Sequence, residues 1–571
     1  MKKRIKNKSA WRAALGYIGK YKLLLVLSLL LSACSVAATL YIPILVGGAI
    51  DDMLSMGAQG IVGRLTVAAV LAAAGGLVTW LAGIINNRIC YNVVRNARNE
   101  AFEHLQRVPL SYIDSRERGD IISRITSDAE QLGDGLLLGF TQLFTGVLTV
   151  AGTLGFMLAL EPVIAAAVAV LTPISLLIAR FIARRTHSLF IGQSEARAAQ
   201  TAFVEEMLTN RKVVAAFSQQ EPACERFGEL NEQVEKTSRT AAFFSSLVNP
   251  STRFVNAVVY AAVTLIGALA AIRGQMTVGT LSCLLSYANQ YAKPFNEISS
   301  VLTELQNALA CAERLFELQN APLQSADGPL ELNGPARVSM DNVCFSYVPS
   351  QPLIRDFSLE VPCGSRVAIV GPTGCGKTTL INLLMRFYDP QSGSISMNGI
   401  NATEISRASL RGNIGMVLQD TWLCSGTVRE NIALGRPEAT DEEIEAAARF
   451  SHAHEFIVKL PKGYDTVISD DDSISQGQKQ LLCISRVALA LPPMLILDEA
   501  TSSIDTRTEM KIQDAFARMM QGRTCFIVAH RLSTIRNADI ILVMKDGNIV
   551  EQGTHAELME RRGFYYQLNN A

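Results

Sequence analysis

A short glycine-rich segment, residues 371–378, contains the residue types that bind phosphate. It fits the pattern G-x-x-x-x-G-K-[ST] at every fixed position. Glycines let backbone N–H groups curl around phosphate oxygens, Lys377 adds a full positive charge, and the Thr378 hydroxyl can ligate Mg²⁺. The pattern predicts a phosphate-binding loop, although eight such residues also occur by chance in glycine-rich turns. The residues expected to bind are Gly371, Pro372, Thr373, Gly374, Cys375, Gly376, Lys377, Thr378 and Thr379.

The flanking sequence places this loop at a turn from a strand to a helix. Residues 366–370 are a short apolar run with β-branched residues, and residues 379–385 have a helical pattern. A second apolar run, residues 494–497, ends in Asp498 and Glu499. Asp498 suits Mg²⁺ held through its water shell, and Glu499 is placed to act as general base on the attacking water. Loop and carboxylates together predict a site that hydrolyses a nucleotide.

The composition indicates several domains and a membrane. A chain of 571 residues has room for three or four domains, and 49% hydrophobic against 18% charged residues is more apolar than a soluble protein of this size. The net charge is zero, which argues against a nucleic-acid partner. The 11 cysteines have no metal-ligand spacing and are expected to be reduced thiols.

Six apolar stretches predict six membrane-spanning helices. The connections after the second and fourth stretches are long and rich in Arg, and the others are short, so we expect both termini in the cytoplasm and the chain in the cytoplasmic membrane. The first stretch is too long for the core of a cleaved signal peptide. The stretches are residues 23–50, 65–85, 137–160, 163–183, 247–272 and 278–301.

The long connections read as helices that continue beyond the bilayer, each interrupted near its middle. The breaks, residues 109–114 and 209–212, are either docking tips or plain turns. The fifth and sixth stretches hold polar residues at bilayer depth. These either line a cavity or join neighbouring helices. They include Asn249, Arg253, Asn256, Asn289, Gln290, Lys293 and Glu297, with Pro294 as an expected kink.

A polar, aperiodic stretch divides the chain. We expect a helical transmembrane domain over residues 1–318, a linker over 319–329 and an α/β domain over 330–571. The last part alternates strand patterns with helical ones, and Asn398-Gly399 and Asp546-Gly547 predict hairpin turns. The fold class is therefore multi-domain: six spans followed by an α/β phosphate-loop nucleotide-binding domain.

In order and spacing, these elements resemble a half-size ATP-binding cassette (ABC) exporter along essentially the whole chain. The resemblance implies that Tyr347 stacks on adenine, that Gln419 contacts Mg²⁺ and the water, and that His530 contacts the γ-phosphate. It also implies that residues 502–505 cross a dimer interface and that Ser475, Gly477 and Gln478 of the signature contact the ATP of a partner chain. The two breaks then resemble coupling helices.

The signature departs from the family pattern. Ile474 and Gln476 stand where the family has Leu and Gly, and an acidic run, residues 470–472, replaces a loop that usually contains Glu and Gly. With Glu499 and His530 intact, the chain resembles the subunit of a heterodimeric multidrug exporter that carries the catalytic Glu; a homodimer is the alternative.

The expected function is export of a drug, lipid or peptide, driven by ATP with Mg²⁺. A membrane-anchored ATPase that senses a ligand and regulates a partner is the alternative.

Overall fold

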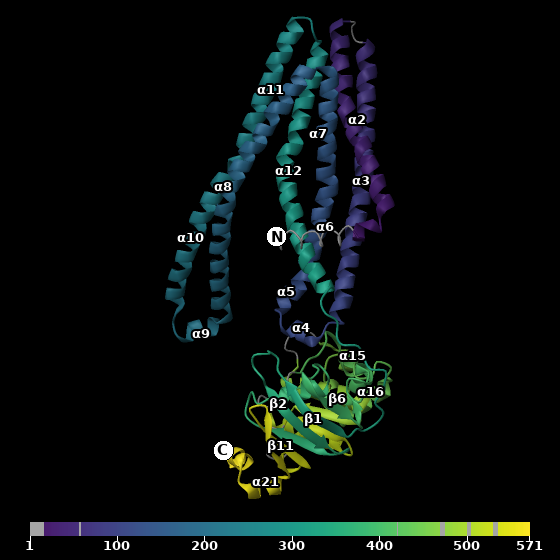
Figure 1. The fold of residues 1–571 in the computed structure, drawn as a ribbon, viewed down its shortest axis with the longest axis vertical. Helices are drawn as coiled ribbons and strands as arrows, with labels where there is room; N and C mark the ends of the chain where they lie inside the picture. Colours follow the sequence, from purple (N-terminus) through teal and green to yellow (C-terminus); the bar gives the residue numbers. More distant parts are fainter. Residues whose placement is uncertain are drawn as a thin grey trace. The chain divides into compact units, whose positions relative to one another are not determined.

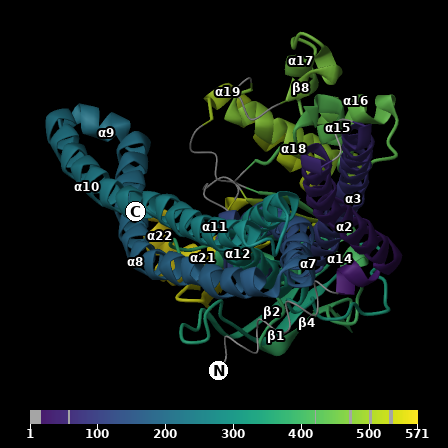
Figure 2. The same ribbon diagram turned by 90° about the horizontal axis from the view of Figure 1, so that it is seen from above.

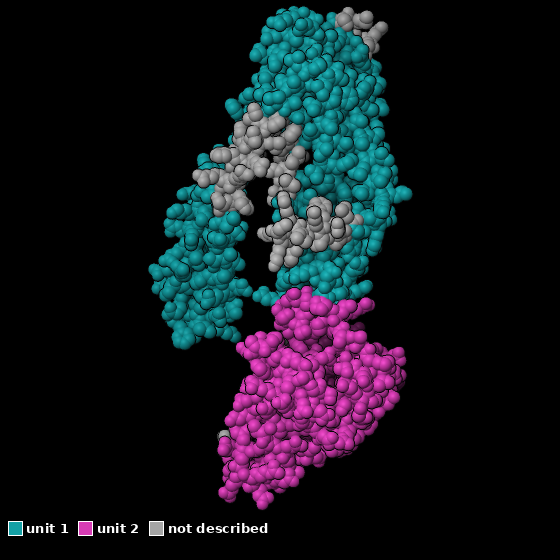
Figure 3. All heavy atoms as spheres, in the orientation of Figure 1, with its two compact units in different colours: residues 1–106, 117–321 teal, residues 107–116, 322–571 magenta. Residues whose placement is uncertain are grey.

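The structure, a computed structural model, divides into two compact units (Figure 3). The helical unit comprises residues 1–106 and 117–321, and the α/β unit comprises residues 107–116 and 322–571. The described residues are 16–55, 59–418, 421–468, 474–498, 504–528 and 535–570. Within these, side chains are described except at residues 55, 59–60, 172–188, 248–249, 252, 295–300 and 302–303.

The helical unit is built from long helices (Figure 1), and each predicted apolar stretch lies in a continuous helical segment. Among the described residues, four helices are long and apolar enough to cross a membrane; they contain the first, second and third stretches and residues 253–272 of the fifth. The fourth and sixth stretches are helical but are not among these four, so six spans remain a prediction. The principal helices are α2 (Lys22–Ser55), α3 (Gln59–Leu105), α7 (Phe144–Leu160), α8 (Pro162–Thr209), α11 (Val248–Ile272) and α12 (Val278–Gln319).

Several of these helices are much longer than a bilayer is thick, as the sequence predicts. The 47 residues of α3 correspond to about 70 Å at 1.5 Å per residue, against a hydrocarbon core of about 30 Å. Both predicted breaks are confirmed: α4 (Leu110–Asp114) follows α3, and α9 (Arg211–Ala216) lies between α8 and α10 (Gln220–Ser246). In Figures 1 and 2, α8 and α10 diverge from α2, α3 and α7 towards α9.

Glycines allow α2 and α12 to approach closely near the end of α2. A Cβ on Gly279 would lie 2.0 Å from the carbonyl oxygen of Gly47, so neither position has room for a side chain. Asp51 of α2 accepts hydrogen bonds from the Gly279 N–H at 2.8 Å and from the Thr277 hydroxyl at 2.7 Å. Because Thr277 is the N-cap of α12, this carboxylate fixes the start of α12 against α2.

Two main sheets form the α/β unit. The first has the order β2-β1-β4-β5 and is antiparallel; the second has the order β12-β11-β3-β10-β9-β6 and is parallel except for β12. The strands are β1 (Val338–Phe345), β2 (Ile354–Val361), β3 (Arg366–Val370), β4 (Ser392–Met397), β5 (Ile400–Asn401), β6 (Ile414–Val417), β9 (Met494–Asp498), β10 (Thr524–Val528), β11 (Ile540–Lys545) and β12 (Asn548–Gly553).

Two apolar cores hold this unit together. One lies between the two sheets and includes the buried face of α13 (Lys377–Leu384); the other packs the far side of the parallel sheet against a group of helices. The predicted hairpin turns are confirmed, since Asn398, Gly399, Asp546 and Gly547 all have positive φ between paired antiparallel strands. The helices of the second core include α15 (Val428–Ala433), α16 (Asp441–Phe450), α18 (Gln476–Ala490) and α19 (Thr506–Met520).

Candidate nucleotide site

The predicted phosphate loop connects β3 to α13, as its flanking patterns indicate. Gly376 has a φ of 102° and is the N-cap of α13, a backbone conformation that favours glycine. At Gly371, a Cβ would lie 2.2 Å from the Met544 carbonyl oxygen, so the loop passes directly against β11. Positive-φ glycines interspersed with ordinary residues form the backbone concavity that binds anions, at the positive end of a helix.

Lys377 lies over its own loop. Its Nζ donates to the carbonyl oxygens of Gly371 at 2.8 Å and Pro372 at 3.0 Å, and lies 3.9 Å from the Cys375 sulfur. The Lys377 ammonium is thus held at the loop by hydrogen bonds to two neutral backbone carbonyls. A phosphate oxygen, being charged, would form a stronger hydrogen bond with it than a neutral carbonyl does.

The remaining loop residues divide into an exposed and a buried group. Pro372, Thr373, Gly374 and Thr378 are exposed, and the Thr378 hydroxyl is therefore available to a metal ion. Thr379 and Cys375 are buried, the latter with 3% of its surface exposed. The side chain of Thr379, in the first turn of α13, is therefore turned towards the protein interior and away from solvent.

Asp498 lies on the same sheet edge as the phosphate loop. In the parallel register, Ile369 of β3 pairs with Val528 of β10, and Val528 pairs with Asp498 of β9. Strands two places apart in a sheet are separated by roughly 10 Å, which is a distance that Mg²⁺ and phosphates can bridge. Asp498 is only 9% exposed. It is the last residue of β9, and α/β sheets bind ligands at this end of their parallel strands.

Three predicted catalytic residues, Gln419, Glu499 and His530, lie outside the described residues, as do residues 470–472 and 502–503. Leu418 and Asp498 are the described neighbours that immediately precede Gln419 and Glu499 along the chain. Of the segment predicted to cross a dimer interface, Asp505 is described. It caps α19 by accepting a hydrogen bond from the Thr508 N–H at 2.9 Å.

Tyr347 presents an exposed ring supported by two other aromatic side chains. Phe345 and Tyr388 each pack edge-on against it, with ring centroids 5.0 Å away. The Asn382 amide of α13 donates to its hydroxyl at 2.9 Å. The ring is 47% exposed, so it remains available for stacking on a planar base while its orientation is fixed by neighbours from β1 and α13.

Comparison with known proteins agrees with this geometry. Residues 25–295 match the ABC transporter transmembrane region and residues 354–502 match the ABC transporter family. The chain is 45% identical over 509 residues to a fatty acid ABC transporter ATP-binding/permease protein of Mycobacterium bovis, covering 89% of this chain and 81% of that protein.

Two further relatives match over most of their length. An ATP-dependent lipid A-core flippase of Syntrophus aciditrophicus is 34% identical, with coverage of 86% and 82%. The structure of a bacterial Atm1-family ABC exporter with ATP bound superposes with a TM-score of 0.79 at 28% identity, covering 96% of this chain and 98% of that chain.

The chain belongs to the ABC transporter family. It is a multi-pass membrane protein that hydrolyses ATP to drive transport, and exporters of this family work as dimers. Among the described residues, no group of His, Cys, Asp or Glu has the arrangement of a metal centre. All 11 cysteines are free thiols.

The family signature begins the helix α18. Ser475 is its N-cap: its hydroxyl accepts from the Gln478 N–H at 3.3 Å, and the Gln478 side chain accepts from the Ser475 N–H at 2.9 Å. Gly477 is buried, and a Cβ there would lie 2.6 Å from the Thr508 side chain of α19. The signature serine is therefore exposed on a rigidly capped helix start.

The two departures in the signature have different consequences. Ile474 is buried in the second core, where another aliphatic side chain serves as well as Leu. Gln476 is exposed, and its Nε2 donates to the Thr421 hydroxyl at 3.0 Å. The long amide is thus fixed beside the exposed signature serine, at a position where the family has no side chain.

The short helix α4 packs within the α/β unit, and sequence reasoning missed the residues that hold it. Tyr388 donates a hydrogen bond to the Asp114 carboxylate of α4. Burial raises the pKa of the Tyr388 hydroxyl, and this hydrogen bond raises it further, so the phenol stays protonated and remains a donor. The same Tyr388 ring packs on Tyr347, which connects α4 to the predicted adenine platform.

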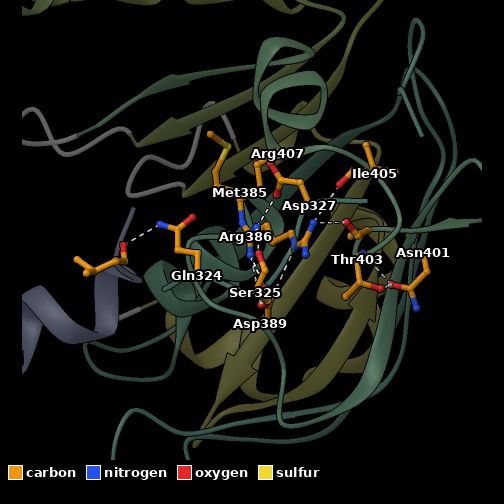
Figure 4. Close-up of polar contacts among 12 residues, drawn as sticks. Gln324, Ser325, Asp327, Met385, Arg386, Asp389, Asn401, Thr403, Ile405 and Arg407 are labelled. Carbon is orange, nitrogen blue, oxygen red and sulfur yellow. Dashed lines mark hydrogen bonds and ion pairs between the residues drawn. The ribbon is translucent and has the colours of Figure 1, made fainter. Parts of the chain in front are cut away.

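The segment that follows α12 is fixed by two buried arginines (Figure 4). Arg407 donates to the Ser325 carbonyl at 2.8 Å and pairs with Asp327 at 2.5 Å. Arg386, shortly after α13, pairs with Asp389 at 3.0 Å. Gln324 completes the arrangement, since its amide donates at 2.9 Å to the carbonyl oxygen of the residue before Pro109, at the start of α4.

Asp389 is the acidic centre of this cluster. Burial opposes its ionisation, but a hydrogen bond from Ser325 and the charges of Arg386 and Arg407 outweigh burial and lower the pKa of its carboxyl. The negative charge therefore persists between the two guanidinium groups. The sequence contained only a partial indication of this cluster: Arg386 and Asp389 follow the phosphate-loop helix, but nothing local indicated that Asp389 accepts a hydrogen bond from Ser325.

Proposed function

We propose that this chain is one half of a heterodimeric exporter that moves an amphipathic molecule out across the cytoplasmic membrane, with both termini in the cytoplasm. The proposal rests on a contrast between the phosphate loop and the signature, two parts of the same α/β unit. The phosphate loop, Lys377 and Asp498 follow the family pattern and lie at the same end of the parallel strands, whereas the signature carries Gln476 in place of glycine.

The residues present fit ATP with Mg²⁺. The loop provides an anion-binding concavity beneath Lys377, and Thr378 and Asp498 provide the oxygen ligands that Mg²⁺ prefers. Bound ATP supplies the phosphoanhydride bond that is broken. We assign Tyr347 to the adenine ring and Lys377 to the phosphate oxygens.

We assign the remaining catalytic roles from sequence position. Glu499 takes the proton of the attacking water, Gln419 positions that water and the metal ion, and His530 holds the γ-phosphate. The exposed Ser475, with Gly477 and Gln478, faces the ATP held by the partner chain. Each ATP is then enclosed by the phosphate loop of one chain and the signature of the other.

Support for an amphipathic substrate comes from the relatives, whose names specify a fatty acid transporter, a lipid A-core flippase and putative multidrug export proteins. These molecules share a large apolar part. They do not share a polar head group, so the relatives support the class of substrate and leave its polar end undefined.

The test is purification from native membranes followed by reconstitution. We expect the tagged chain to copurify with one equivalent of a second half-transporter. In proteoliposomes, the pair should accumulate an amphipathic dye in an ATP-dependent manner and hydrolyse ATP at least about tenfold faster than this chain alone. Recovery of a fully active homodimer would overturn the heterodimer, and substrate-stimulated hydrolysis without vectorial accumulation would overturn export.

A further inference from the structure

The helical unit contains a cavity of about 320 Å³ among α2, α3, α7 and α12. This volume lies in the range of small-molecule sites, roughly 300–1,000 Å³. Most of the surface that faces the cavity is apolar, but nine of the lining residues carry a hydroxyl or amide group and none carries a charge. Polar groups at bilayer depth are costly unless they have partners or a function, so their concentration around one cavity points to a ligand.

The threonines of this cavity present acceptors rather than donors. Thr141, just before α7, and Thr145 and Thr149 within α7 recur every four residues, which places them on one helix face, and all three line the cavity. Thr141 donates its hydroxyl proton to the Leu137 carbonyl at 2.7 Å, and Thr149 donates to the Thr145 carbonyl at 2.8 Å. Thr145 likewise donates to the Thr141 carbonyl. With the proton engaged, each hydroxyl offers only lone pairs to a ligand.

The opposite wall repeats this arrangement. Thr39 of α2 donates to the Ser35 carbonyl at 2.9 Å, and Thr79 of α3 donates to the Gly75 carbonyl at 2.9 Å. The Ser35 and Thr79 hydroxyl oxygens lie 2.5 Å apart and bond to each other. Both walls of the cavity therefore present hydroxyl oxygens whose protons are already engaged; Ser32, which also lines it, makes no side-chain hydrogen bond to a described residue.

Two neutral amides complete the lining. Asn86 of α3 is 2% exposed; its Oδ1 accepts from the Ser28 hydroxyl at 2.5 Å, and its Nδ2 makes no hydrogen bond to a described residue. Gln290 of α12 lines the same cavity, which favours the cavity interpretation of the polar residues in the sixth stretch. Side chains at residues 295–300, which include Glu297, are outside the described set.

We propose that this cavity binds the polar end of the exported amphiphile, and that this end donates hydrogen bonds and is not anionic, as in an alkylammonium. Converging hydroxyl oxygens give the cavity a partial negative potential. An ammonium would be solvated by these acceptors. A carboxylate would lose its water and find only the neutral donors of Ser32, Asn86 and Gln290, with no cation among the lining residues. The proposal rests on the proposed export function, because it names the substrate class of that same membrane domain.

The test measures binding of three matched probes to the full chain in nanodiscs of zwitterionic lipid, without ATP. Decylammonium, decanol and decanoate share one chain length and differ only in the polar end. We expect decylammonium to bind at least about tenfold more tightly than decanoate, with decanol between them. Decanoate binding equal to or tighter than decylammonium would overturn the proposal.

Two variants locate the effect in this cavity. Thr145→Val with Thr149→Val should weaken decylammonium binding about fivefold to tenfold, since roughly one acceptor hydrogen bond is lost, and should leave decanoate unchanged. Thr264→Val is the matched control, because Thr264 of α11 makes the same backbone hydrogen bond, to Tyr260 at 2.8 Å, but does not line the cavity. An equal effect of both variants would place the binding elsewhere.

A charge insertion provides the converse test. Gln290→Lys places an ammonium in the lining and should reverse the preference to decanoate, with thermal unfolding confirming that the variant is folded. Unchanged order of the probes in a folded Gln290→Lys variant would overturn the proposal. Failure of the export function would be seen separately, as absent ATP-dependent accumulation while the binding order persists.

Discussion

In the proposed dimer, the phosphate-loop face and the signature face of the α/β unit would contact two different ATP molecules, and the two faces differ in how closely they follow the family pattern. On the loop face, the glycine conformations, Lys377 and Asp498 all agree with the family pattern. On the signature face, the helix start is capped and buried correctly, but Gln476 occupies the position of a glycine. Among the described residues, the loop face therefore keeps the family pattern and the signature face departs from it at one exposed position.

The start of α18 shows that a helix can keep its capped structure while a residue expected to lie near nucleotide changes. The capping box of Ser475 and Gln478 and the burial of Ile474 preserve the structure of α18. We infer that Gln476 affects the access of a second nucleotide to the backbone at this helix start. A dimer of two such chains would have two equal, hindered sites, whereas a partner with an intact signature would complete one good site.

The largest effects should come from the loop face. Lys377→Ala should weaken ATP binding, since it removes the charge held over the loop, and Glu499→Gln should leave binding intact while slowing turnover about 100-fold or more, as expected for loss of a general base. Nucleotide binding and steady-state ATPase of the purified pair measure both. Turnover within a few-fold of the unmodified pair would remove Glu499 from the mechanism.

Restoring glycine on the signature face should have the next largest effect. Gln476→Gly removes the amide beside Ser475, and we expect the chain expressed alone to gain ATPase activity about tenfold. Thr421→Val is the matched control: it removes the hydrogen-bond partner of Gln476 at 3.0 Å and keeps the side chain. The interpretation fails if Gln476→Gly changes nothing, or if Thr421→Val gives the same gain.

Two cysteines allow the faces to be compared chemically. Cys375 lies in the loop and is 3% exposed, and Cys483 lies in α18 with partial exposure. In versions that retain only one of them, a non-hydrolysable ATP analogue should slow maleimide labelling of Cys375 about tenfold and that of Cys483 less than twofold. Labelled Cys375 should no longer bind nucleotide. Equal protection of both thiols, measured by mass spectrometry, would mean that one chain's nucleotide covers both faces.

Much of the loop face was predictable because its signals are local. The strand over residues 366–370, the carboxylate after residues 494–497 and both hairpin turns follow from patterns a few residues long, and the structure has them. Periodicity also predicted the long helices and the two breaks, while six spans remain a prediction beside the four helices that meet the length and apolarity of a span.

Long-range polar contacts were not predictable in this way. Tyr388 and Asp114 are far apart in sequence, and so are Gln476 and Thr421. Arg386 and Arg407 are buried, although arginine is usually a surface residue, because the linker and Asp389 supply their partners. Such pairs depend on which surfaces the fold brings together, and residue type at one position gives no indication of it.

The contact between Tyr388 and Asp114 gives the smallest predicted effect and extends the comparison from the nucleotide faces to α4. Tyr388→Phe removes the hydrogen bond to α4 but keeps the ring that packs on Tyr347. We therefore expect an unchanged KM for ATP and an unchanged basal turnover. Stimulation of the ATPase by substrate should fall about fivefold, as for loss of about 1 kcal/mol from one hydrogen bond.

A matched control separates this coupling from general loosening of the domain. Tyr464→Phe removes a comparable hydrogen bond, to His454 at 2.9 Å, in the group of helices that includes α16. It should leave substrate stimulation unchanged, and Asp114→Asn should lower it as Tyr388→Phe does. If Tyr464→Phe reduced stimulation equally, or if KM for ATP rose in Tyr388→Phe, the contact would support the fold or the adenine platform. The contact would then not couple nucleotide binding at the phosphate loop to α4.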